Sequence, residues 1–301
     1  MHTDHCFICG KDNPVGLRAR FEAPTAGAIV AHFVGQEQHQ GYPGRMHGGV
    51  IAALLDEVAA RALAAQATKT NETARELRVR YRQPVPLGVA LTARGRLVAT
   101  DERGAVAELL LADGTIAVEA HLRYVAAGFA EDDVRRSGRS WPDGRAIMRK
   151  QPNSRMCFVC GTSNCSGLHV RFYERDDNSV LARFVAAGHH ADHTGHMSLA
   201  AVAATLDEAM GRAIMIPYGE AIWGVTAELS FRLLRPIPVG VELSSTGRIT
   251  AERSRLFEGS GELWLPNGAL AVTGHGRYVK LDMVTLGGFD PEQEEWGVRP
   301  D

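Results

Sequence analysis

The sequence lacks any apolar run of the roughly 20 residues that a membrane-spanning helix needs, and it lacks a long basic run. Its 33 Lys and Arg nearly balance its 35 Asp and Glu, for a net charge of −2. We therefore expect neither a membrane nor a nucleic acid as its partner. The first residues show no basic region followed by an apolar one, and cysteine is scarce, with 5 residues. These absences indicate a cytoplasmic protein with reduced thiols and no signal peptide.

An internal repeat is the main feature that is present. Cys6-x-x-Cys9-Gly10 returns as Cys157-x-x-Cys160-Gly161, at an offset of 151 residues. The same offset relates the pairs Asn13 and Asn164, Phe33 and Phe184, His39 and His190, Gly44 and Gly195, Met46 and Met197, and Asp56-Glu57 and Asp207-Glu208. After one inserted residue, Pro84-x-Pro86 matches Pro236-x-Pro238. The chain therefore contains two copies of one domain.

The repeat predicts four parts. Residues 1–126 form a first domain and residues 154–283 a second. The polar, irregular stretch 127–153 between them is typical of a surface linker. The acidic tail 284–301 contains Trp296 and could lie on the surface or be disordered.

Each copy predicts the same elements. Two strands, of which the first spans 17–21 or 168–172, precede a long helix at about 48–66 or 199–215. Segments with a period of two residues then predict four more strands. Val50 to Leu55 offers no polar residue on any helix face, so this helix should be buried.

The start of the first helix, His47-Gly48-Gly49, suggests a reactive site. The first amides of a helix have no intrahelical acceptors and lie at the positive end of its dipole. Glycine also lets another group approach the backbone closely. Asp56 and Glu57 follow within an otherwise apolar segment, where carboxylates are costly unless they are paired or used.

This combination resembles the hotdog-fold acyl-CoA thioesterases of the phenylacetyl-CoA (PaaI-like) type, over about 6–125 and 157–280. The specific part is His47-Gly48-Gly49 followed by Asp56, nine residues after His47. The resemblance implies an α+β fold: two hotdog domains in tandem, each with a long central helix wrapped by an antiparallel sheet, paired as a pseudo-two-fold dimer within one chain. It also implies a thioester hydrolase that acts on acyl-CoA or a related thioester without a cofactor or a required metal.

The resemblance further implies that each active site combines a helix entrance from one domain with a helix carboxylate from the other. Distance requires the same arrangement, because Gly48 and Asp56 lie about 12 Å apart along one helix and catalytic contacts span about 3 Å. His47-Gly48-Gly49 would therefore combine with Asp207 of the second copy.

The two copies differ in a way that predicts one working site. The first site would contain His47, Gly48, Gly49, Asp207 and Thr226. The second, degenerate site would contain Ser198, Leu199, Ala200, Asp56 and Ala74, and it lacks both the glycines and the hydroxyl group.

The expected roles follow the resemblance. The N–H of Gly48, together with that of Gly49, would bind the oxyanion, and Asp207 would act as general base or nucleophile. Thr226 would orient the water or the carboxylate. His47 would fix the turn, or bind the carbonyl or the pantetheine, rather than act as the base. The substrate pocket would be lined by His39, Gln40, Tyr42 and Glu208.

Three other patterns have alternative interpretations. The two Cys-x-x-Cys motifs have the spacing of metal ligands, so one zinc ion could be shared by Cys6, Cys9, Cys157 and Cys160. We favour the other interpretation, in which these thiols are small buried structural residues. The histidines at 189, 190, 193 and 196 surround Asp192, and we interpret them as pocket lining rather than metal ligands. Arg78, Arg80 and Arg82 form one face of a strand; this face should be solvated, or else contact the phosphates of coenzyme A.

Two other functions remain open from the sequence. The chain could be a non-catalytic acyl-CoA-binding or regulatory protein, which the retained Asp207 and Asp56 disfavour. It could be a hotdog hydratase or dehydratase, which would need an Asp/His pair that the helix entrance lacks. The acyl group (small, medium-chain or aromatic) and assembly into a homo-oligomer are left open.

Overall fold

The computed structural model describes residues 4–65, 72–98, 103–126, 147–192, 194–282 and 289–300. Both halves contain two strands, one long helix and four more strands, in the predicted order. The first half consists of β1 (Arg20–Thr25), β2 (Ala28–Val34), α1 (Gly48–Ala64), β3 (Glu72–Tyr81), β4 (Ala90–Leu97), β5 (Gly104–Leu110) and β6 (Ile116–Ala126). The second half consists of β8 (Arg171–Arg175), β9 (Ser179–Val185), α2 (Leu199–Gly211), β10 (Ile222–Leu233), β11 (Glu242–Glu252), β12 (Leu256–Trp264) and β13 (Leu270–Asp282). It also has β7 (Ile147–Lys150) and the short α3 (Met215–Tyr218).

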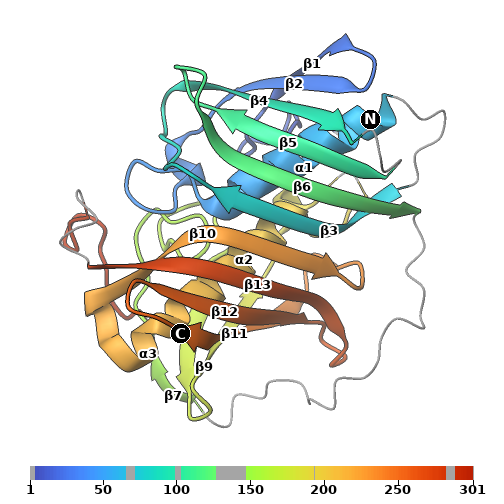
Figure 1. Ribbon diagram of the computed structural model, residues 1–301. Helices are drawn as coiled ribbons and strands as arrows, with labels where there is room; N and C mark the ends of the chain where they lie inside the picture. The colour runs from blue at the N-terminus through green and yellow to red at the C-terminus, as the bar shows by residue number, and fades with distance from the viewer. Residues whose placement is uncertain are drawn as a thin grey trace.

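The strands form one antiparallel sheet that runs through both halves. Its 13 strands have the order β1-β2-β4-β5-β6-β3-β10-β13-β12-β11-β9-β8-β7. The halves join where β3 pairs with β10, with Val79 opposite Leu229 and Leu77 opposite Phe231. Figure 1 shows these two strands side by side at the middle of the sheet, with α1 and α2 behind it. The predicted fold, two tandem hotdog domains in an α+β arrangement, is confirmed.

The two long helices pack against each other on one face of the sheet. Every residue from Gly49 to Leu55 is buried, as an all-apolar helix requires. Gly49 lies directly against α2, because a Cβ atom built on it would be 2.3 Å from the Cα of Ala204. Glycine at this position allows the helix containing the entrance to contact the helix containing the carboxylates.

The repeated Cys motifs connect the two halves. The rings of Phe7 and Phe158 lie 5.3 Å apart between centroids. The amide of Asn13 donates to the carbonyl of His189, and that of Asn164 donates to the carbonyl of Gln38. Each Cys turn is thus held to the loop that precedes the helix of the other half, which explains why both asparagines recur.

Some boundaries differ from the sequence prediction. β1 begins at Arg20 rather than Leu17, because the amides of Leu17 and Ala19 donate to the Cys turn instead of to a strand. α2 ends at Gly211, and a 3₁₀ turn and α3 continue the path toward β10. Residues 147–150 of the predicted linker form β7, and the last linker residues, 151–153, are buried rather than on the surface. Residues 127–146 lie outside the described residues.

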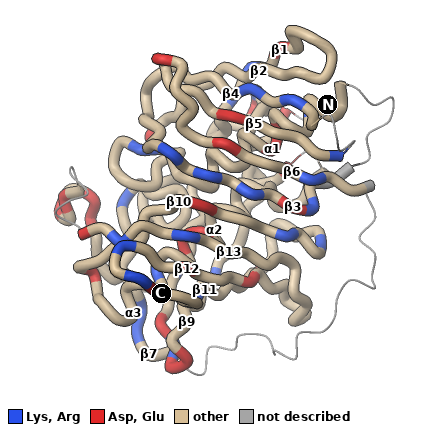
Figure 2. Tube along the Cα trace, in the orientation of Figure 1, with Lys and Arg blue, Asp and Glu red and all other residues tan. Residues whose placement is uncertain are grey.

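The outer face of the sheet carries charges of both signs. Figure 2 shows basic and acidic segments interspersed along β3, β6, β10 and β13. Arg78 pairs with Glu228 and Arg82 with Glu119, both on this face. Among the described helices, none is long and apolar enough to cross a membrane.

Candidate active site

The N-terminus of α1 and the middle of α2 meet at a cavity between the two halves. A Cβ atom built on Gly48 would lie 3.2 Å from Oδ2 of Asp207. Thr226, on β10, donates its hydroxyl hydrogen to Oδ1 of Asp207 at 2.9 Å. One cavity, with about 760 Å³ of empty space that is partly open to solvent, is lined by residues of both halves, among them His47, Gly48, Asp207 and Thr226. The two halves therefore contribute to a single crevice.

The first turn of α1 leaves the amide of Gly48 available to a ligand. The Gly49 N–H donates to Nδ1 of His47 at 3.0 Å, so the histidine caps its own helix. The Gly48 N–H has no acceptor within the described part of the chain. Its carbonyl accepts a hydrogen bond from the Tyr81 hydroxyl at 2.8 Å, which holds this residue in place. Gly48 can thus offer a hydrogen bond to a ligand oxygen, whereas Gly49 serves capping and helix packing.

Asp207 is a buried carboxylate whose charge is only partly compensated. Burial raises the pKa of Asp207 to about 6, although the nearby His47 and the hydrogen bond from Thr226 limit the increase. Tyr278 donates to the backbone carbonyl of Asp207 at 3.1 Å and fixes this part of α2. A carboxylate with a pKa close to neutrality can accept a proton from water under ordinary conditions.

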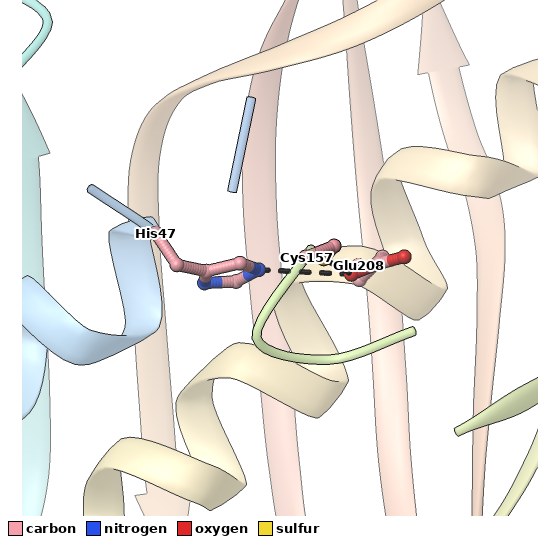
Figure 3. A group of neighbouring side chains, drawn as sticks. All are labelled: His47, Cys157 and Glu208. Atoms are coloured by element: carbon pink, nitrogen blue, oxygen red, sulfur yellow. Dashed lines mark hydrogen bonds and ion pairs between the residues drawn. The ribbon is translucent and has the colours of Figure 1, made fainter. Parts of the chain in front are cut away.

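Glu208, the next residue, is held as a permanent anion. Its carboxylate accepts from Arg212 at 2.8 Å and from the Cys157 thiol at 3.3 Å, and it faces Nε2 of His47 at 3.6 Å. Figure 3 shows His47, Cys157 and Glu208 converging from α1, the second Cys turn and α2. Burial opposes the charge, but Arg212 and His47 outweigh it and lower the pKa of Glu208 to about 2. Glu208 therefore orients His47 rather than exchanging protons.

A metal ion needs several ligand atoms close together. Within the described residues, these three side chains are the one group of at least three His, Cys, Asp or Glu residues whose potential metal-ligand atoms all lie within 4.8 Å of one another. Nδ1 of His47 accepts the Gly49 amide, so the proton of the neutral ring lies on Nε2. A metal-bound histidine has the reverse arrangement, because its free nitrogen donates to a second-shell acceptor. The donor set therefore fits a hydrogen-bond network better than a metal.

The four repeated cysteines do not form a common zinc site. All four belong to the described residues, yet no group of ligand atoms combines Cys6 or Cys9 with the second pair. Cys157 and Cys160 border the cavity. The alternative in which all four cysteines share one zinc ion is therefore not supported by their positions.

Two predicted pocket residues lie elsewhere. His39 is completely buried, with Nε2 against the Val15 carbonyl at 3.1 Å and Nδ1 accepting the Gln36 amide. The side-chain oxygen of Gln40 accepts the Gly44 amide at 3.0 Å. Neither lines the cavity, because both side chains are used to hold the loop before α1.

Tyr42 and Glu208, the other two predicted pocket residues, do line the cavity. The Tyr42 hydroxyl donates to the carbonyl of Gly224 at 3.1 Å, which ties the loop before α1 to β10.

The described histidines of the second copy's cluster do not line the cavity, so the expectation that they line the pocket is wrong for them. The rings of His189 and His190 lie 4.1 Å apart between centroids. His190 repeats the role of His39, with its ring held by the Ser166 carbonyl at 2.9 Å and the Ala187 amide. His196 contacts the Thr194 hydroxyl, and His193 lies outside the described residues.

The residues predicted to form the degenerate second site have contacts of their own. Ser198 caps α2, and its side chain faces the Ala201 amide at 3.5 Å. Asp56 accepts from the Tyr124 hydroxyl at 3.0 Å, and burial raises its pKa to about 7. Ala74 lies opposite Tyr124 just as Thr226 lies opposite Tyr278, so no threonine hydroxyl is present.

Several cavity residues were not predicted from the sequence. They are Trp223, Arg212, Met215, Phe289 and Trp296. Tryptophan is rare here, with 4 residues in the chain, and two of the four border one cavity. Their convergence depends on the folding of the tail, which no periodic pattern indicates.

Comparison with known proteins identifies the class. The sequence profile of the thioesterase superfamily matches residues 43–120 and 194–272, once in each half. The chain belongs to the thioesterase superfamily, as a member with two tandem hotdog domains. No curated protein matches the sequence.

Solved structures share the fold at low sequence identity. Acyl-CoA thioesterase II TesB2 from Mycobacterium marinum has a TM-score of 0.61 and 11% identity, with 90% of this chain and 98% of that chain covered. A putative thioesterase from Novosphingobium aromaticivorans has a TM-score of 0.58 and 18% identity, with 86% and 97% covered.

Proposed function

We propose that this protein hydrolyses an acyl thioester, most simply an acyl-CoA, at one composite site between its two hotdog domains. The observation that carries the proposal is the placement of Asp207 Oδ2 beside the backbone of Gly48, at the open end of α1. This brings an unpaired amide and a carboxylate of raised pKa into one cavity. A thioester carbonyl between them could be polarised on one side and attacked on the other.

The Gly48 N–H would donate to the carbonyl oxygen and stabilise the negative charge that develops on it. Asp207 would remove a proton from water as the water adds to the carbonyl carbon, or would attack that carbon itself. Thr226 would keep the carboxylate in position through its hydrogen bond at 2.9 Å. The carbon–sulfur bond then breaks, and on the general-base route the sulfur leaves as a thiol with the proton that Asp207 took from water, while the acyl group leaves as a carboxylic acid. If Asp207 attacks instead, the thiolate leaves and takes a proton from solvent, and the acyl group stays on Asp207 as an anhydride until a water molecule hydrolyses it to the acid.

The choice of coenzyme A as the thiol carrier rests on family membership and on relatives named as acyl-CoA thioesterases. A closer relation to the phenylacetyl-CoA (PaaI-like) type rests on the His47-Gly48-Gly49 motif. The five free cysteines suit a reducing compartment such as the cytoplasm.

The test compares the two helix aspartates in equivalent positions. Release of free thiol from a panel of acyl-CoA substrates is measured for the wild type, Asp207→Asn and Asp56→Asn. We expect Asp207→Asn to lower kcat by at least about 100-fold, as is typical for loss of an acid–base group. Asp56→Asn should keep most of the activity. Equal loss in both variants, or full activity of Asp207→Asn, would refute the assignment.

A further inference from the structure

The tail of the chain folds back onto the second domain and is fixed there. The backbones of Asn153 and Gly297 pair through two hydrogen bonds of 2.8 and 3.1 Å. The indole N–H of Trp296 donates to Glu220 at 2.7 Å, and the Arg212 guanidinium lies 5.3 Å from the ring centroid of Trp296. The buried Asn153 also donates to the Cys160 carbonyl, so the tail is tied to the turn that borders the cavity.

Four aromatic rings gather at this place from three distant parts of the chain. The centroid of Trp223 lies 4.7 Å from that of Trp296, 4.8 Å from that of Phe289 and 5.6 Å from that of Tyr42. All four line the cavity that contains Asp207 and Gly48. The cavity thus has a polar part at the helix entrance and an aromatic wall to which the tail contributes two of four rings.

The chemistry of a thioester matches this division. The carbonyl group requires the polar groups at the helix entrance, and the acyl chain beyond it gains free energy by leaving water for an apolar surface. Aromatic side chains provide a large, rigid contact surface with few rotatable bonds. Rigid rings at the end of a pocket also limit the length of the acyl chain that the pocket can hold.

We propose that the aromatic wall made by Tyr42, Trp223, Phe289 and Trp296 is the acyl-binding subsite, and that the tail residues Phe289 and Trp296 limit the length of acyl chain accepted. This proposal rests on the proposed function for its substrate, and it assigns the site to short, compact acyl groups. Trp223, which contacts the other three rings, has no aromatic counterpart in the first copy: at the offset of 152 residues that holds after the helices, it corresponds to Asn71.

The experiment measures kcat/KM for straight-chain acyl-CoA substrates from acetyl to palmitoyl. The wild type should reach its maximum with short chains and lose activity beyond it. In Trp296→Ala the maximum should move to chains several carbons longer, with a gain of up to about fourfold for each additional buried methylene. KM for the short chains should rise, because part of their contact surface is lost. Trp296→Phe should retain the wild-type limit.

Val298→Ala is the matched control, because Val298 lies in the same tail, is 59% exposed and does not line the cavity. It should leave the chain-length profile unchanged. If Trp296→Ala fails to fold, as judged by its thermal transition, Phe289→Ala replaces it with the same expectation. A chain-length profile that is identical in the wild type and the tail variants would overturn the proposal.

A binding measurement separates this proposal from the proposed function. Acyl-CoA binding to Asp207→Asn, and to the same variant with Trp296→Ala, is followed by calorimetry over the same chain lengths. A shift toward longer chains in binding supports the subsite even if the wild type hydrolyses nothing, which would refute only the proposed function. Hydrolysis of acyl-CoA with no shift in binding would refute the subsite alone.

Discussion

Thr226, on β10, donates its hydroxyl hydrogen to the Asp207 carboxylate, at 2.9 Å to Oδ1 and 3.2 Å to Oδ2. This contact both positions the carboxylate and lowers its pKa, against the larger effect of burial. The equivalent carboxylate, Asp56, has a tyrosine hydroxyl in the same role, since Ala74 replaces the threonine. The two halves thus hold the same aspartate in different ways.

Replacing the threonine tests whether its hydrogen bond positions Asp207. Thr226→Val keeps the shape but removes the donor, so kcat should fall by about tenfold, the equivalent of one hydrogen bond to a charged group. The pKa of Asp207 should rise at the same time, which shifts the pH–rate profile to higher pH. Thr226→Ser should restore both values, whereas a purely structural role would leave the pH profile unchanged.

The pH dependence of hydrolysis should report the ionisation of Asp207. Its pKa is raised to about 6, and the deprotonated form is the one that can accept a proton. We expect kcat/KM to rise with pH through about 6 and then to level off. Glu208, with a pKa of about 2, stays charged throughout and adds no second transition in this range.

Asp56→Asn provides the control for this profile. Burial raises the pKa of Asp56 to about 7, but Asp56 belongs to the site that we predict to be degenerate. The variant should leave the midpoint near 6 unchanged. A midpoint near 4 in the wild type, or one that moves in Asp56→Asn, would contradict the role given to Asp207.

The sign of the stability effect is opposite to that of the activity. A carboxyl group whose pKa is higher in the folded state than in the unfolded chain stabilises the fold relatively more at low pH, and this contribution is lost as pH rises from about 4 to 6. Asp207 is such a group. Asp207→Asn should therefore unfold at no lower urea concentration than the wild type at pH 8, even though we expect its activity to be low.

The fold could be predicted from the sequence because the same pattern of apolar helix and alternating strands occurs once in each half. The apolar run Val50–Leu55 is buried as expected, and the strand segments of both copies lie where the period of two residues predicts them. The joining of the two sheets through β3 and β10 was not predicted. Alternation along a strand shows which face is buried but not which strand pairs with its edge.

The candidate site could be predicted only in part. Comparing the copies isolates Gly48 and Thr226, because these residues differ where the carboxylates do not. The comparison does not separate His39 from the pocket, because His39 recurs as His190 just as Asp56 recurs as Asp207. Only the contacts show that both histidine rings bind backbone groups and so hold the loop before the helix.

Gly48→Ala should reduce activity with little effect on stability. The new Cβ would lie 3.2 Å from Asp207 Oδ2 and 3.3 Å from the Tyr81 hydroxyl, in the space where the thioester must approach. We expect kcat/KM to fall by about 100-fold, comparable to the loss of an oxyanion donor. Leu199→Ala, at the matching position of α2, should leave hydrolysis unchanged, and similar losses in both variants would contradict the choice of working site.

Gly49→Ala should show the opposite behaviour, because this glycine serves helix packing. Its Cβ would lie 2.3 Å from the Cα and 2.4 Å from the Cβ of Ala204, where α1 and α2 are both buried. The helices would have to move apart, at a cost of about 1–3 kcal/mol for an overpacked core, which exceeds the gain of about 0.5–1 kcal/mol for alanine over glycine within a helix. Urea denaturation should therefore show a lower free energy of unfolding for Gly49→Ala, while Gly48→Ala unfolds like the wild type. An unchanged midpoint for Gly49→Ala would mean that the two helices are not in contact here.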